Sequence, residues 1–167
     1  MKSQQTIFQV LKSDHREVNA MLKELCKMTT PTEKRKKLFE KMKTELLAHA
    51  YAEDEVFYNT LVPGIKKPHL IFEAKEEHHL VEFLMAELQS PELSPEEWNA
   101  KIIVLKELVE HHVEDEEGDV FEQAEKLLDK ESSKEIAQQM LERKQELIEA
   151  GIDVEEESTH HRMVSNA

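Results

Sequence analysis

Helix-breaking residues are rare in this chain and lie at regular intervals. The 167 residues include only three glycines and five prolines. Leucine, glutamate, lysine, methionine and alanine, which favour helices, dominate the stretches between them. The β-branched residues are scattered and form no strand-like runs. We therefore expect an all-α fold.

Turn and capping signals divide the chain into five expected helices. The prolines and the glycine within 63–68 mark one break, and Gln89-Ser90-Pro91 marks another. Residues 30–33 (TPTE) and 94–97 (SPEE) each combine an N-cap, a proline at the first helical position and a capping-box glutamate. Gly151 lies where a glycine commonly ends a helix. The signals predict helices over 4–28, 31–61, 68–89, 95–128 and 132–150.

The loops between these helices are short, so consecutive helices are expected to pack antiparallel. This arrangement predicts an up-down-up-down four-helix bundle with an additional C-terminal helix. One domain is expected to span residues 1–150, because a chain of this length can bury a single core. A polar tail is expected over 151–167.

Charge and cysteine content limit the partners and the compartment. The formal net charge of −14 argues against nucleic acid or an anionic membrane surface as the main partner. Cys26 is the only cysteine, so no internal disulfide can form and a reducing compartment is expected. The sequence begins without the apolar stretch of a signal peptide, and no stretch approaches membrane-spanning length. We expect a cytoplasmic protein.

Nine histidines are many for this length, and their positions on the expected helices are informative. Each can be compared with the apolar stripe of its own helix. His15 and His49 lie within the stripes of the first and second helices. The stripe of the fourth helix surrounds His112 and leaves His111 on the flank, and the third helix favours His78 over His79. Each of the four helices is thus expected to send one histidine inward.

Two of these helices add a glutamate one turn after the histidine. Residues four apart project from adjacent turns of one helix face and can reach a common ion. At about 1.5 Å of rise per residue, the candidate residues of all four helices lie at a similar depth in an up-down bundle. Burying them without a cation would be costly. The pattern predicts a metal site formed by His15, His49, Glu53, His78, His112 and Glu116.

The composition of this ligand set limits the metal. It contains no thiolate, and it suits iron, manganese or zinc rather than a closed structural zinc site. Six ligands spread over four helices are too many for one tetrahedral ion, whereas they are natural for two ions bridged by carboxylates.

Four segments together resemble the hemerythrin-like HHE cation-binding proteins, and the resemblance covers nearly all of residues 1–150. The segments are 12–15 (KSDH), 49–58 (HAYAEDEVFY), 76–88 (EEHHLVEFLMAEL) and 111–117 (HHVEDEE). The resemblance implies two iron ions with an oxo or hydroxo bridge, with manganese or zinc as less expected substitutes. It also implies that Glu53 and Glu116 bridge the ions, that one ion is bound by His15 and His49, and that the other is bound by His78 and His112.

The sequence departs from the oxygen-carrying hemerythrins at two points. Those proteins have two inward histidines on the third helix and an aspartate bridge in the fourth. Here the residue one turn before His78 is Ala74 and the residue one turn after it is Glu82. Glu82, a water molecule or an open coordination position could take the place of the missing histidine. The departure speaks against simple reversible O2 carriage.

Other residues near the expected site are weaker candidates. Asp14, Glu55 and Glu117 could orient imidazoles, although solvated surface acids are more common. Tyr58 could hydrogen-bond near the site, although packing is the commoner role of a tyrosine at a helix end. Gly118 is unusual in the fourth helix and is expected to mark a kink.

Three functions follow from such a centre. The first is a protein that binds or senses a small ligand, namely O2, nitric oxide or peroxide. The second is an enzyme with peroxidase-like, catalase-like or ferroxidase activity. The third is a bundle that uses the ions for stability or holds iron in reserve. The sequence favours the first.

Overall fold

The computed structural model describes residues 4–154, and this part of the chain is all-helical. Two segments, η1 and η2, are π-helical and continue the helices before them. The elements are α1 (Ile7–Lys27), α2 (Glu33–Ala52), η1 (Glu53–Tyr58), α3 (Asn59–Leu61), α4 (His69–Leu88), α5 (Pro95–Asp115), η2 (Glu116–Val120), α6 (Phe121–Glu125) and α7 (Lys130–Glu149).

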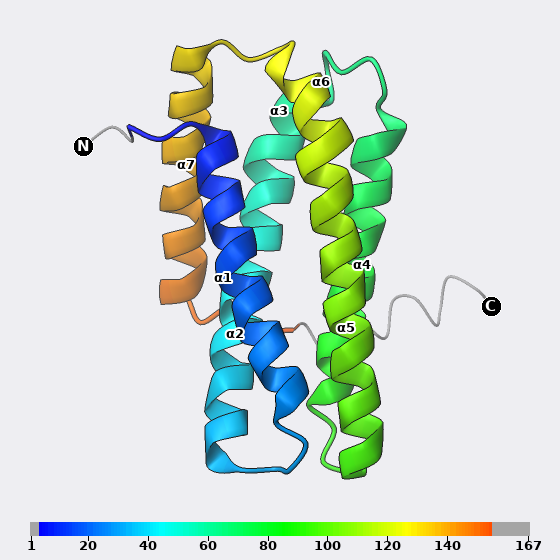
Figure 1. The fold of residues 1–167 in the computed structure, drawn as a ribbon. Coiled ribbons are helices and arrows are strands. Elements are labelled where there is room, and N and C mark those ends of the chain that lie inside the picture. The colour runs from blue at the N-terminus through cyan, green and yellow to red at the C-terminus, as the bar shows by residue number, and fades with distance from the viewer. Residues whose placement is uncertain (1–3, 155–167) are drawn as a thin grey trace, which may run out of the picture.

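The long helices form the predicted antiparallel bundle (Figure 1). α1 and α4 run in one direction, and the continuous helices α2–η1–α3 and α5–η2–α6 run in the other. α7 packs outside this bundle along α1 and α2. The prediction of an all-α, up-down-up-down four-helix bundle with an additional C-terminal helix is confirmed. No helix of the described residues is both long and apolar enough to cross a membrane.

The helix starts depend on local capping. Ser94 and Glu97 form the predicted capping box of α5, with both reciprocal hydrogen bonds present. α2 begins later than predicted, because the side chain of Thr32 accepts the hydrogen bond from the Arg35 amide at 3.2 Å and so replaces Thr30 as the N-cap.

The last helix also begins at a different residue from the predicted one. Asp129 caps α7 by accepting a hydrogen bond from the Ser132 amide at 2.8 Å, so the helix starts at Lys130. α7 ends just before Gly151, whose φ of 76° is a conformation that glycine adopts easily. Of the predicted polar tail, residues 155–167 lie outside the described part of the chain.

The apolar core is divided into two clusters along the bundle. The first, built around Leu11, Phe57 and Phe121, lies where α1 and α4 begin. The second, built around Leu22, Met42 and Leu105, lies toward the other end of the same four helices. On every helix, the residues between the two clusters include the predicted histidine. A polar layer therefore crosses the bundle between two apolar halves.

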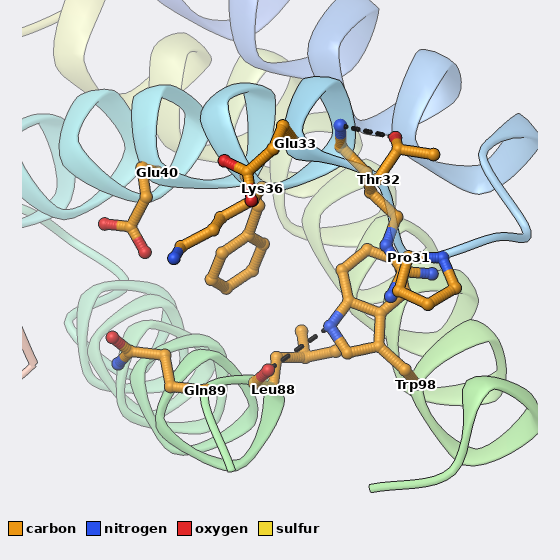
Figure 2. A pocket seen from close by; sticks show the side chains of 10 residues that line it. Pro31, Thr32, Glu33, Lys36, Glu40, Leu88, Gln89 and Trp98 are labelled. Atoms are coloured by element: carbon orange, nitrogen blue, oxygen red, sulfur yellow. Dashed lines mark hydrogen bonds between the residues drawn. The ribbon is translucent and has the colours of Figure 1, made fainter. Parts of the chain in front are cut away.

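A cavity of about 510 Å³ lies at the end of the bundle where α2 and α5 begin (Figure 2). The guanidinium of Arg35 lies 3.9 Å from the centroid of the Trp98 ring, and the Trp98 indole donates a hydrogen bond to the Leu88 carbonyl. None of the six predicted metal-ligating residues lines this cavity. The candidate site must therefore be sought in the polar layer.

Candidate metal centre

The six predicted metal-ligating side chains all lie buried in the polar layer. Both glutamates are 0% exposed, and the four histidines are between 3% and 8% exposed. The neighbouring side chains of His79 and His111 are 47% and 64% exposed. The structure thus turns His78 and His112 inward, as the helix phase predicts. The burial places these six residues together, and their binding of metal remains a prediction.

Each glutamate lies between imidazoles from two different helices. Oε2 of Glu116 is 3.3 Å from Nε2 of His15 and 3.5 Å from Nε2 of His112. Oε2 of Glu53 is 3.6 Å from Nε2 of His49 and 3.3 Å from Nε2 of His78. Each carboxylate therefore contacts one imidazole from each of the two pairs that the family resemblance implies. This is the placement that a bridging carboxylate requires.

Several atoms of this layer are buried without a hydrogen-bond partner. Among the residues that the structure describes, these atoms include Nε2 of His15 and His49, both carboxylate oxygens of Glu53, and Oε2 of Glu116. Buried polar atoms left in this way cost free energy, and native proteins rarely leave them so. A cation among them would satisfy all five. The residues present therefore fit a bound metal.

The converging atoms form two groups that share a carboxylate. Glu53 belongs both to a group with His15, His49 and Glu116 and to a group with His78 and His112. Within each group, the candidate ligand atoms all lie within 4.8 Å of one another. The site is thus divided as two neighbouring ions would require.

A ring of four outer carboxylates orients the imidazoles. In each case Nδ1–H of a histidine donates to an acid from a neighbouring helix, which leaves Nε2 directed into the layer. We call these acids the carboxylate ring. The contacts are Asp14 Oδ2 to His49 at 3.0 Å, Asp54 Oδ1 to His78 at 2.9 Å, Glu77 Oε2 to His112 at 2.6 Å, and Glu117 Oε1 to His15 at 3.0 Å.

Two acids of this ring, Asp14 and Glu117, were weak candidates in the sequence, where solvated surface acids were the favoured interpretation. Asp14 and Glu117 orient imidazoles, whereas Glu55 forms an ion pair with Arg143. Asp54 and Glu77 were missed. A signal was present, because every acid of the carboxylate ring is next in the sequence to one of the six buried residues. The acid on each of the four helices thus orients the histidine of the next helix in the chain, and the acid on the last helix orients the histidine of the first.

A known protein family matches most of this chain. Residues 6–124 match the Hemerythrin HHE cation binding domain. The chain belongs to this family. A solved structure of a hemerythrin HHE cation binding domain-containing protein from Mycobacterium kansasii superimposes with a TM-score of 0.75 and 23% sequence identity, covering 87% of this chain and 89% of that one, which supports the fold. No curated protein matches the sequence.

The charges of the HHE site compensate one another. Burial would raise the pKa of Glu53, but the charge of His49 and the neighbouring imidazole of His112 lower it well below its usual value. Burial would lower the pKa of His49, but Glu53 and Asp14 raise it to about 10. A proton on His49 therefore offsets part of the carboxylate charge. A cation that binds His49 must displace this proton.

Tyr58 is part of the HHE site and not only of the core. Its hydroxyl donates to Oε1 of Glu116 at 3.2 Å, and its ring stacks on His78 with a centroid distance of 5.7 Å. Burial and the charges of Glu116, Glu53 and Asp54 raise the pKa of Tyr58 well above its usual value. The phenol therefore stays protonated and remains a donor toward Glu116.

The position of the missing fifth histidine is a small cavity. Ala74 lines a space of about 20 Å³ whose inner wall includes His112 and Glu116. A space of this size holds about one water molecule. Glu82 instead accepts a hydrogen bond from the Tyr51 hydroxyl at 3.0 Å. Glu82 is therefore held by Tyr51 and does not line this cavity.

A second small cavity lies on the other side of the four imidazoles. It also measures about 20 Å³, and the remainder of its wall is apolar. The apolar lining residues are Val18, Leu46, Val81, Val109 and Val113. The HHE site therefore has one cavity lined partly by acids and one closed by hydrocarbon.

Proposed function

We propose that the buried layer binds two iron ions and that this di-iron centre binds or senses a small ligand, namely O2, nitric oxide or peroxide. The observation that carries the proposal is the set of five unpartnered atoms on four residues that converge between the imidazoles. The proposed ligands are His15, His49, Glu53, His78, His112 and Glu116. Imidazole and carboxylate without thiolate suit iron, with manganese or zinc as less expected substitutes.

The proposed bridging role of the glutamates follows from their contacts. Glu116 lies between His15 and His112, and Glu53 lies between His49 and His78. Because the carboxylate ring accepts the Nδ1 hydrogen bond of each histidine, Nε2 is the nitrogen that would bind metal. Glu116 accepts a hydrogen bond from the Tyr58 hydroxyl, and Asp54 accepts one from Nδ1 of His78. These two hydrogen bonds fix neighbouring side chains of the layer.

The apolar cavity supports a small ligand rather than a bulky substrate. Bound iron supplies the electrons and the coordination position with which a diatomic molecule or peroxide combines. Val81 and Val109 close the cavity beside the imidazoles and exclude water from it. Its volume of about 20 Å³ leaves no room for an organic substrate. The single cysteine, Cys26, is consistent with a reducing compartment, and we place the protein in the cytoplasm.

Adding azide or nitric oxide to the iron-loaded protein is expected to change its charge-transfer absorption, whereas cumene hydroperoxide, which is too large for the cavity, should change it far more slowly. Val81→Leu adds one methylene to the cavity wall and should slow azide binding while iron content stays the same. The measurement is stopped-flow absorbance with iron analysis of each sample. An unchanged spectrum with azide, nitric oxide and peroxide would refute ligand binding.

The same samples separate a binding protein from an enzyme. A protein that binds or senses peroxide should react with about one equivalent per centre, whereas a catalyst would consume many equivalents. Glu116→Ala is the control, because any iron-dependent consumption must be lost when this proposed bridge is removed. The peroxide that remains after mixing gives the count, and oxygen release measured with an electrode identifies catalase-like turnover.

A further inference from the structure

We propose that Glu77, His111 and Asp115 form a surface site that captures a divalent metal ion and passes it to the buried centre. The inference rests on the proposed metal centre but concerns a different set of residues. Oδ2 of Asp115 is 3.2 Å from Nε2 of His111, and Oε1 of Glu77 is 3.7 Å from the same nitrogen. These ligand atoms all lie within 4.8 Å of one another. One imidazole and two carboxylates are donors that first-row divalent ions accept.

The surface site repeats the spacing of the buried one. His111 and Asp115 are four residues apart on α5, one residue before His112 and Glu116. The inner pair is buried, whereas the side chains of the outer pair are 64% and 55% exposed. A cation can thus reach the outer pair from solvent. The inner pair lies on the next face of the same helix turn.

Glu77 connects the surface site with the buried centre. Its Oε1 faces His111 at the surface, and its Oε2 accepts the hydrogen bond from Nδ1 of His112 at 2.6 Å. The carboxylate is half-buried, with a side-chain exposure of 17%. A single side chain of α4 therefore contacts both the surface site and the imidazole of the buried centre.

The cavity at Ala74 connects the surface site with the buried centre. Its wall includes Glu73, Glu77 and Asp115 near the surface and His112 and Glu116 at the inner end. Glu116 is 0% exposed, and its Oε2 has no hydrogen-bond partner among the described residues. The cavity thus runs from exposed acids to a buried carboxylate that has one unpartnered oxygen.

Charge also favours capture at this place. The chain carries a formal net charge of −14, and three of its carboxylates gather at the outer wall of the cavity. Clefts lined by charges of one sign concentrate ions of opposite sign and raise association rates by about 10- to 1000-fold. An exposed site with three ligands binds its ion less tightly than the buried layer, so the ion can leave it inward.

The test compares how fast the metal-free protein takes up Co²⁺, a coloured divalent probe. The variant His111→Ala/Asp115→Asn removes the surface site but leaves Glu77 in the carboxylate ring. The matched control is His79→Ala/Glu76→Gln, which removes another exposed histidine–acid pair on α4, 3.3 Å apart and absent from the cavity wall. Stopped-flow absorbance follows uptake, and metal analysis after desalting gives the final content.

We expect the His111/Asp115 variant to load roughly tenfold more slowly than the wild type, in line with the low end of electrostatic rate enhancement, and to reach the same final content. The control should load at the wild-type rate. Equal rates for all three proteins would overturn the surface site while leaving the buried centre intact. If the wild type itself takes up no metal, the proposed centre fails, and the surface site fails with it.

Discussion

Replacing Glu53 by glutamine is expected to remove both metal ions from the protein, not one. Glu53 is the carboxylate shared by the two ligand groups, and it contacts His49 and His78. An amide keeps the size of the side chain but loses the charge and the ability to bridge. Loss of a carboxylate that only orients a ligand already lowers metal affinity about 10- to 100-fold. We therefore expect loss of Glu53 to lower the affinity for both ions by more than about 100-fold. Metal analysis after dialysis measures this.

The matched control for this substitution is Glu82→Gln. Glu82 lies one turn after His78 and hydrogen-bonds to Tyr51, so the variant should keep its full metal content. Circular dichroism confirms that both variants remain helical. A Glu53→Gln protein that retains two ions would contradict the shared bridge. Loss of metal in Glu82→Gln would instead assign Glu82 to the position of the missing histidine.

Removing the metal is expected to lower the melting temperature strongly, and more so at high pH. Metal bound at 1000 times its dissociation constant stabilises a protein by about 4 kcal/mol per site. For a chain of this size, that corresponds to a shift of roughly 10 °C or more. The measurement is thermal unfolding by circular dichroism, with and without a chelator, between pH 6.5 and 9.

The pH dependence follows from the raised pKa of His49. Its value is about 10 in the folded protein against 6.5 for a free histidine, so its stabilising contribution is complete below about pH 6.5 and is lost as pH rises toward 10. The metal-free protein should therefore lose stability over this range. The metal-loaded protein lacks this proton and gains affinity with pH, because cations and protons compete for the imidazoles. Equal melting temperatures with and without chelator would contradict the account.

Helix periodicity was sufficient to find the buried histidines and glutamates. The phase of the apolar stripe separates His78 from His79 and His112 from His111, because one residue changes the direction of a side chain by more than a quarter turn. The common depth of the six residues follows from short loops and antiparallel helices. Helix phase is a property of a single helix, and depth follows from the order of the helices along the chain. Both can therefore be predicted from the sequence.

Contacts between helices were harder to predict. Asp54 and Glu77 reach histidines of other helices, and nothing in the period of their own helix distinguishes them from solvated acids. Gly118, where the sequence predicts a kink, lies within the π-helical segment η2. The equivalent segment η1 begins at Glu53 and contains no glycine. Both segments start at the buried glutamates, and π-helical turns are frequent at functional sites.

Metal content and the optical spectrum of protein purified in air test the proposed di-iron centre. We expect two iron ions per chain and charge-transfer absorption that is absent from Glu53→Gln. One ion per chain would contradict the pair of ligand groups that share Glu53. Stoichiometric zinc with no visible absorption would contradict the proposed binding of O2, nitric oxide or peroxide.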